Sequence, residues 1–346
     1  MVNKLYIVTP RGFCAGVEMA IKALTWMLKI YDGPVYCYHE IVHNDWIVDK
    51  FKKKNVIFIE DTDELPKDSI VMLSAHGTAP DIEKEFKNIS LTSVNSVCPL
   101  VTKVHHEAKK FSESGKQIIY VGHKNHDEAI GALGVAPEHM HLVESVDDIK
   151  NINYQDKEVA LLAQTTLAMS EWEPILDKVK EDFDNLDLPR KSDLCYATTN
   201  RQKALINISN NVDVVLVVGS SSSSNTKALV TTIKNLGKEA YRIETLNDLE
   251  DINLESKDVA ITAGASAPEH IVNEISNFLK PKNFEYYIDT DEDEYFPLPK
   301  ELRANISSLS RLLVTMFPSN KIEAKNSISK DKSWSATEAL ASLYSN

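Results

Sequence analysis

Cysteine is scarce in this sequence. The 346 residues include four cysteines, Cys14, Cys37, Cys98 and Cys195. Four cysteines are too few for a disulfide framework, and these four are too widely spaced to form a compact zinc-finger motif. Each cysteine therefore needs its own explanation, and we expect the thiols to be reduced.

Long apolar runs are also missing. Even the run Val214–Val218 is followed by a glycine and five serines, so no window approaches the eighteen or so uninterrupted apolar residues of a membrane helix. The N-terminus lacks the positively charged stretch and longer apolar run of a secretory signal. We therefore expect a cytoplasmic protein that starts at Met1 without a cleaved leader and has no membrane partner.

Basic residues are too few for a chain that binds nucleic acid. Lysine and arginine number 38 against 51 aspartates and glutamates, which gives a net charge of -13 and disfavours contact with a phosphate backbone. Glycine-rich nucleotide motifs are absent as well. Residues 219–225 lack the closing Gly-Lys-Ser/Thr of a Walker loop, and no Gly-x-Gly-x-x-Gly sequence occurs. We therefore expect neither a nucleic-acid partner nor a bound nucleotide.

The sequence does contain a regular alternation of strand and helix patterns. Short apolar runs rich in β-branched residues predict strands at Leu5–Val8, Val35–Tyr38, Ile70–Leu73, Ile118–Val121, Val159–Ala163, Val214–Val218 and Val259–Thr262. Such continuous runs are typical of strands buried on both faces of a parallel sheet. Helical spacing of apolar residues occupies stretches between them, as in Val17–Ile30 and Thr226–Leu236. The alternation predicts an α/β fold.

Three of the cysteines mark a repeat in this pattern. Cys14, Cys98 and Cys195 lie 84 and 97 residues apart, and each precedes two predicted strands that end in polar residues. These strand-end residues are His43 and His76 after Cys14, His126, Glu128 and Thr165 after Cys98, and Ser223, Ser224, Asn225 and Ser266 after Cys195. We therefore expect three pseudo-threefold-related lobes, each a small parallel sheet flanked by helices. The expected boundaries are 1–97, 98–194 and 195–306, with an extra tail at 307–346.

Three sheets facing one axis would bring the three thiols to one centre, because ligands of open parallel sheets bind beyond the carboxyl ends of the strands. Each of these cysteines lies next to a predicted helix start, where the helix dipole favours a thiolate. Three thiolates suit a zinc ion completed by a histidine, or three irons of a [4Fe-4S] cluster whose fourth iron stays open. The spacing does not choose between them. Cys37 lies inside a predicted strand, so we expect an apolar core residue there.

The polar strand ends indicate a small phosphorylated ligand. Histidine, serine and asparagine side chains offer donors to phosphate oxygens, and residues 266–269 predict a helix entry whose amides add an anion site. Each residue alone is more often a helix cap or a turn residue, so the prediction depends on their shared position. Glu128 is the one carboxylate among them and is the candidate proton donor. The alternative is a solvated surface glutamate.

Seven motifs along the chain resemble those of one known family. They are PRGFCAGV at 10–17, HEIVHN at 39–44, SAHG at 74–77, CPLVTKVH at 98–105, QTTL at 164–167, CYATTNRQ at 195–202 and TAGASAP at 262–268. In this order they resemble the 4-hydroxy-3-methylbut-2-enyl diphosphate reductase family of LytB type, the last enzymes of the non-mevalonate isoprenoid route. The resemblance extends from about residue 4 to residue 303.

The resemblance implies a three-lobed α/β oxidoreductase around a [4Fe-4S] cluster bound by Cys14, Cys98 and Cys195. Such enzymes remove the substrate hydroxyl as water and yield isopentenyl and dimethylallyl diphosphate, with electrons from a partner such as ferredoxin or flavodoxin. By resemblance, the residues that handle the hydroxyl and its proton are His126, Glu128 and Thr165. By resemblance, the residues that bind the diphosphate are His43, His76, Ser223, Ser224, Asn225 and Ser266. Lewis-acid coordination by iron and protonation by Glu128 would both help a poor leaving group to depart.

Two other functions remain compatible with the residues alone: a zinc-dependent hydrolase of a small phosphorylated substrate, and a non-enzymatic iron-sulfur sensor or carrier.

The tail departs from the family pattern. Residues 309–317 and 334–344 predict short helices there, whereas 321–332 is polar and predicted to be mobile. We expect an inert or mobile tail in preference to a docking segment.

Overall fold

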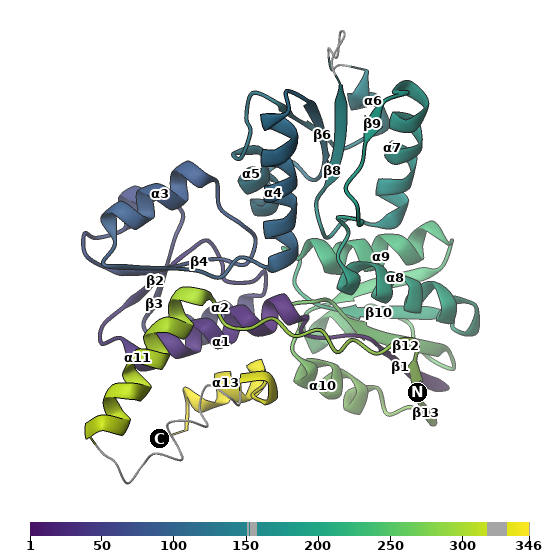
Figure 1. Ribbon diagram of the computed structural model, residues 1–346. Helices are drawn as coiled ribbons and strands as arrows, with labels where there is room; N and C mark the ends of the chain where they lie inside the picture. The colour runs from purple at the N-terminus through teal and green to yellow at the C-terminus, as the bar shows by residue number, and fades with distance from the viewer. Residues whose placement is uncertain (151, 153–157, 317–330, 346) are drawn as a thin grey trace. The chain divides into compact units, whose positions relative to one another are not determined.

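Short strands form three parallel sheets, one of five strands and two of four (Figure 1). The computed structural model describes residues 1–150, 152, 158–316 and 331–345. Each strand pairing within these residues is parallel, and helices flank each sheet. The predicted α/β class with three small parallel sheets is therefore confirmed.

The five-stranded sheet belongs to the first of two compact units, which comprises residues 1–14 and 100–293. In the order β11-β10-β12-β1-β13, its strands are Glu239–Ile243, Val214–Val218, Asp258–Ala263, Lys4–Thr9 and Asn283–Ile288. Helices α8 (Tyr196–Ile208) and α9 (Ser224–Asn235) pack on the face that carries Val217. Helix α10 (Glu269–Leu279) packs on the opposite face, beside Leu216. Both faces of β10 are thus covered, as its continuous apolar run predicts.

A four-stranded sheet completes this unit. In the order β7-β6-β8-β9, its strands are Met140–Val143, Gln117–Val121, Val159–Ala163 and Leu186–Asp187. Helices α4 (Pro99–Glu113) and α5 (Asp127–Leu133) pack against Tyr120 on one face. Helices α6 (Val146–Ile149) and α7 (Met169–Asp182) pack against the opposite face. The carboxyl ends of β6 and β8 lead into α5 and into the turn before α7.

The second unit, residues 15–99 and 294–346, contains the other four-stranded sheet. In the order β3-β2-β4-β5, its strands are Val56–Ile59, Val35–Tyr38, Ile70–Leu73 and Thr92–Asn95. Cys37 lies in β2 between Phe58 and Met72 of the neighbouring strands, with no exposed surface. Burial raises the pKa of this thiol. The prediction that Cys37 is a core residue is therefore confirmed.

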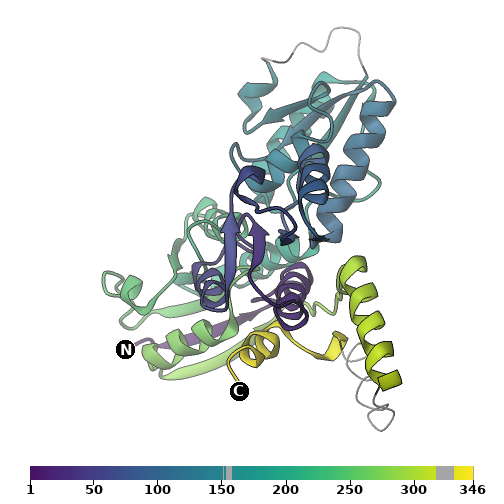
Figure 2. The ribbon, with the colours of Figure 1, turned by 90° about the vertical axis from the view of Figure 1, so that its left-hand side faces the viewer.

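The helices of the second unit include one that extends into the tail, α11, and one that lies within it, α13. Their bounds are α1 (Ala15–Ile30), α2 (Asp45–Lys52), α3 (Pro80–Ile89), α11 (Lys300–Met316) and α13 (Ala336–Ser342). Helix α13, yellow in both views, lies along α1 (Figure 1 and Figure 2). The predicted tail helices correspond to α11, which begins earlier than expected, and α13. The predicted mobile stretch 321–332 lies outside the described residues except for its last two.

The placement of the N-terminal strand differs from the expected lobe boundaries. Strand β1 pairs with β12 on one side, with Lys4 opposite Asp258, and with β13 on the other, with Lys4 opposite Asn283. A strand buried on both faces is stable where both of its edges are hydrogen-bonded, and these two strands supply the partners. Residues 1–14 therefore belong with the five-stranded sheet and not with the lobe expected at 1–97. The other boundaries stay predictions.

The helices in the described part of the chain give no candidate for a membrane span, since none combines sufficient length with sufficient apolar character. The remaining regular elements are 3₁₀ turns at Thr62–Glu64, Ser209–Asn211, Leu246–Leu249 and Asp331–Ser333. Three of these turns connect elements within a single unit, and the last precedes α13.

Candidate functional site

Glu128 and Thr165 meet beyond the carboxyl ends of β6 and β8. Glu128 lies in the first turn of α5, and Thr165 follows β8 by two residues. One carboxylate oxygen of Glu128 accepts a hydrogen bond from the Thr165 backbone N–H at 2.7 Å, and the other accepts from the Thr165 hydroxyl at 2.9 Å. Glu128 is 2% exposed. The structure thus brings two of the predicted catalytic residues into direct contact and excludes the solvated-glutamate alternative.

Burial controls the ionisation of this carboxyl. It raises the pKa of Glu128 from 4.5 to about 7, although both hydrogen bonds from Thr165 favour the carboxylate. The negative charge of Asp193 adds to the rise. A carboxyl with a pKa near 7 is present in both protonation states at neutral pH. Glu128 can therefore donate a proton and be reprotonated under ordinary conditions.

His126 caps the helix that carries Glu128. Its Nδ1 accepts a hydrogen bond from the Glu128 backbone N–H at 3.2 Å. A ring nitrogen that accepts carries no proton, so the neutral imidazole has its proton on Nε2. His126 and Glu128 are therefore held in one turn, with the Nε2–H of the histidine as a donor.

Thr165 also contacts the segment that carries Cys195. The Thr165 carbonyl accepts a hydrogen bond from the Cys195 backbone N–H at 3.0 Å. Two residues earlier, the buried carboxylate of Asp193 accepts from the Ala163 backbone N–H at 3.0 Å and from Lys103 Nζ at 2.8 Å. These bonds attach the turn before α8 to the end of β8. The backbone at Cys195 is therefore fixed next to the Glu128 and Thr165 pair.

A chain of hydrogen bonds connects Cys195 with Cys14. The Cys14 backbone N–H donates to the Ala265 carbonyl at 3.1 Å, and the Ala265 N–H donates to Asn225 Oδ1 at 2.9 Å. Asn225 Nδ2 donates to Thr198 Oγ1 at 3.3 Å. Thr198 Oγ1 in turn lies 3.1 Å from Cys195 Sγ. Two predicted metal ligands and one predicted substrate-binding residue thus share a single network.

The charge of Cys14 affects the ionisation of Cys195. Burial around the sulfur raises the pKa of Cys195 to about 12, and the charge of Cys14 is the next cause. Neighbouring thiolates repel each other, and binding to a soft metal deprotonates thiols outright. The sulfur donors in this unit therefore fit a zinc or iron centre by their chemistry.

The serines after β10 and β12 stand at helix starts. Ser223 is the N-cap of α9, where its Oγ accepts a hydrogen bond from the Thr226 backbone N–H at 3.3 Å. Ser224 Oγ lies 3.2 Å from Gln164 Nε2. Ser266 is 6% exposed in the turn between β12 and α10. Ser223 is therefore a helix cap, which is the more common role of such a residue. The first turns of α9 and α10 add backbone donors suited to an anion.

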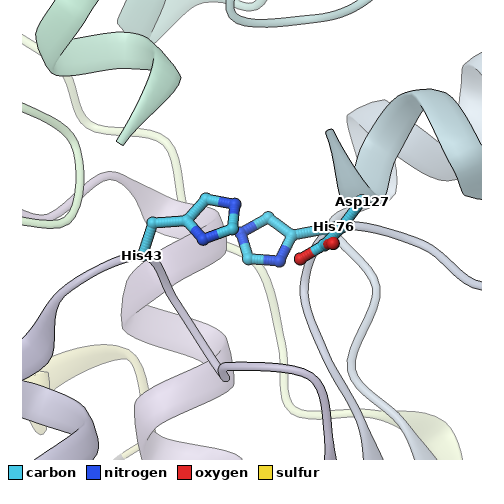
Figure 3. Close-up of side chains that lie close together, drawn as sticks. All are labelled: His43, His76 and Asp127. Atoms are coloured by element: carbon cyan, nitrogen blue, oxygen red, sulfur yellow. The ribbon is translucent and has the colours of Figure 1, made fainter. Parts of the chain in front are cut away.

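In the second unit, His43 and His76 stack on each other (Figure 3). Their ring centroids are 4.0 Å apart and their planes differ by 14°. His43 lies just before α2, whose N-cap Asn44 accepts from the Ile47 backbone N–H at 3.1 Å, and His76 follows β4. The two imidazoles predicted to bind phosphate are therefore brought together beyond the carboxyl ends of β2 and β4.

Cys98 belongs to the same unit as these histidines. Its backbone N–H donates to the carbonyl of Ala75, the residue before His76, at 3.0 Å. Ser96 Oγ donates to the Leu73 carbonyl at 2.5 Å. Cys98 itself directly precedes α4. The segment that carries this cysteine is thus attached to the segment that carries His76.

Two residues that hold the site were not predicted from the sequence. Thr198 contacts the Cys195 sulfur. Arg201, which is 1% exposed, donates from Nη1 to the Gly12 carbonyl at 2.6 Å and from Nη2 to Glu292 at 3.0 Å. Both lie in the CYATTNRQ motif, three and six residues after the cysteine. Helical spacing from Cys195 was the available signal for both.

In the first unit, two thiols, a buried carboxylic acid and the His126 imidazole lie near the carboxyl ends of parallel strands, and they define an α/β protein with an enzyme-like, metal-compatible site. A sequence profile of the family described as LytB protein matches residues 5–280. The chain belongs to this family. The membership predicted from the seven motifs is therefore confirmed.

Similar proteins extend over most of the chain. A protein of Rhodopirellula baltica named 4-hydroxy-3-methylbut-2-enyl diphosphate reductase is 42% identical, covering 87% of this chain and 96% of its own. The protein of the same name in Streptomyces coelicolor is 39% identical, covering 90% and 94%. The solved structure of the E-1-hydroxy-2-methyl-but-2-enyl-4-diphosphate reductase from Plasmodium falciparum superposes with a TM-score of 0.86 at 36% identity, covering 89% of this chain and 99% of that one.

Proposed function

We propose that this chain reduces 4-hydroxy-3-methylbut-2-enyl diphosphate to isopentenyl diphosphate and dimethylallyl diphosphate. Its similar proteins in Rhodopirellula baltica and Streptomyces coelicolor carry the name of this reductase. The observation that carries the proposal is the buried Glu128 carboxyl, which Thr165 holds through two hydrogen bonds while also bonding the backbone of Cys195. A proton donor thus stands beside a thiol suited to a redox metal centre.

Glu128 has the properties that the loss of a hydroxyl group needs. The reaction consumes two electrons and two protons: the C–O bond breaks, one proton leaves with the hydroxyl as water, and the other forms the new C–H bond. Hydroxide is a poor leaving group, so a proton delivered to its oxygen lowers the barrier. The raised pKa of Glu128, about 7, keeps that proton available at neutral pH. Thr165 orients the carboxyl, His126 caps the helix turn that carries it, and both offer further hydrogen bonds to the hydroxyl.

We propose that Cys14, Cys98 and Cys195 bind a [4Fe-4S] cluster. Soft thiolate donors are the usual ligands of such clusters, and three of them leave one iron for a substrate ligand. The hydrogen-bond network that joins the backbone of Cys14 to the Cys195 sulfur supports a shared role for these two thiols. When bound, the cluster supplies a Lewis acid for the hydroxyl and the route by which electrons arrive from a donor protein such as ferredoxin or flavodoxin.

The diphosphate is assigned to neutral donors. The residues proposed to bind it are His43, His76, Ser223, Ser224, Asn225 and Ser266. Imidazole, hydroxyl and amide groups, together with the backbone N–H groups at the starts of α9 and α10, hold an anion without a cluster of lysines. This explains how a protein with a net charge of -13 accepts an anionic substrate.

Anaerobic purification followed by metal analysis and turnover tests this function. We expect brown protein that contains iron and sulfide and, with a low-potential reductant, converts the diphosphate substrate to both products. Colourless protein that contains zinc and hydrolyses a phosphorylated compound would identify the zinc hydrolase instead. Brown protein without turnover of this substrate would identify a sensor or carrier.

A further inference from the structure

The hydroxyl of Thr198 is a buried group with a defined position beside sulfur. Thr198 has no exposed surface and stands in the first turn of α8, for which Cys195 is the N-cap. The Cys195 sulfur lies 3.1 Å from Thr198 Oγ1. A hydroxyl is therefore among the groups that contact this sulfur.

The network determines where the Thr198 proton points. The backbone N–H of Ala265 can only donate, so the Asn225 atom facing it at 2.9 Å is the oxygen Oδ1. The amide nitrogen of Asn225 must then face Thr198, and it also can only donate. Thr198 Oγ1 accepts this bond, which directs its own proton to the Cys195 sulfur. A metal-bound thiolate carries no proton, so it can only accept.

We propose that Thr198, oriented by Asn225, is a positioning residue that donates a hydrogen bond to the Cys195 sulfur and thereby sets the reduction potential of the iron-sulfur cluster. The inference rests on the proposed function, in which Cys195 is a cluster ligand. The step concerned is the uptake of one electron by the cluster from an external donor such as ferredoxin. The reduced cluster has one more negative charge, so a hydrogen bond to its sulfur stabilises the reduced form more than the oxidised form.

The test is an EPR-monitored redox titration of the anaerobic holo-protein and of Thr198→Val, which replaces the hydroxyl by a methyl group of similar size. We expect one-electron reduction to become about three- to tenfold less favourable, and the tenfold limit corresponds to about 59 mV toward more negative potential. Thr198→Ser keeps the hydroxyl and is expected to retain the wild-type potential. Iron and sulfide per chain are measured for each protein, so that only fully loaded samples are compared.

Thr25→Val is the matched control. Thr25 is also a helical threonine without exposed surface, and its hydroxyl has no hydrogen-bond partner among the described residues. The same replacement there is expected to leave the potential unchanged. An equal shift in Thr25→Val would attribute the effect to general repacking and would overturn the proposal.

Asn225→Ala tests the orienting bond in the absence of substrate. We expect a shift in the same direction as in Thr198→Val but smaller, and no further shift when both replacements are combined, because the two residues act on one hydrogen bond. A wild-type potential in fully loaded Thr198→Val would overturn the inference and leave the proposed function intact. If the valine variant does not fold, Thr198→Ala serves for the same comparison. If the variants show the shifts but the wild-type protein does not turn over the diphosphate, the proposed function alone is contradicted. Protein without iron would contradict both.

Discussion

Lys22 of α1 donates a hydrogen bond from Nζ to the backbone oxygen of Asp331 at 3.0 Å, although 309 positions separate the two residues. Both are buried, at 2% and 6% exposure, and a carboxylate oxygen of Asp331 lies 3.7 Å from the same ammonium. Tyr295 donates from its hydroxyl to that carboxylate. A buried, paired charge therefore anchors the last part of the chain to α1.

Other contacts continue this anchor along the helix. The ring of Trp334 meets Trp26 edge-on, with centroids 5.7 Å apart. The Glu18 carboxylate accepts a hydrogen bond from the Ala336 backbone N–H at 2.7 Å, where α13 begins. Residues 331–345 thus form a docked segment and not the inert or mobile tail expected from the sequence, because α1 offers them both an apolar surface and charged partners.

We expect Asp331→Ala to destabilise the second unit by about 3 kcal/mol, because it removes the carboxylate that pairs with the buried Lys22 ammonium. Denaturant unfolding measures the loss, and hydrogen exchange over α13 shows whether the docked segment has detached. Glu113→Ala is the control, since its ion pair with Lys109 at 3.8 Å is exposed and is worth less than about 1 kcal/mol. Equal losses in the free energy of unfolding for the two replacements would show that the buried pair stabilises the protein no more than an exposed pair does.

Glu128→Gln is expected to lower turnover by about 10²-fold or more with unchanged iron content, because glutamine keeps the size and the acceptor for the Thr165 backbone N–H but cannot donate an acidic proton. The wild-type rate should fall as pH rises through about 7. The pKa of Glu128 is raised to that value, so the protonated form that donates is lost above it and retained below it. Steady-state rates with an artificial reductant between pH 6 and 9 measure both effects. Full activity of the variant would remove Glu128 from the mechanism.

Strands and their polar ends could be predicted because the information is local. The run Val214–Val218 matches β10 and Val159–Ala163 matches β8, residue for residue. A continuous β-branched run has few alternatives to a two-sided buried strand. The meeting of Glu128 with Thr165 followed from the same logic, since polar residues after adjacent parallel strands lie at one edge of a sheet.

Relationships between distant segments could not be read in this way. Nothing in the run of β1 indicates that its neighbours are β12 and β13, more than 250 positions away. The direction of the Thr198 hydroxyl depends on Asn225 and Ala265, which belong to other elements. In the sequence, Lys22 and Asp331 look like two ordinary surface charges, and only the structure shows that they form a buried pair. Pairing across the chain, not propensity, determines all three.

Replacement of two cysteines separates a core thiol from a proposed ligand. We expect Cys37→Ser to cost about 1–3 kcal/mol, because it buries a hydroxyl in β2 among apolar neighbours, while iron per chain stays at the wild-type level. Cys98→Ser should diminish the iron content or destabilise the cluster. Metal analysis of the two anaerobically purified variants measures the difference. A matching loss of iron in both would reopen the choice of ligands.

Arg201 is expected to preserve the loop that ends at Cys14. Its guanidinium joins the Gly12 carbonyl to the Glu292 carboxylate, and two separate nitrogens make these bonds from a fully buried position. A lysine has one compact ammonium and cannot span both partners, so Arg201→Lys should loosen the loop and speed the loss of iron to a chelator. Arg242→Lys is the matched control in the same unit, because Arg242 is partly exposed and pairs with its near neighbour Glu244. Equal rates of iron release in the two variants would show that the two hydrogen bonds from the Arg201 guanidinium do not position Cys14.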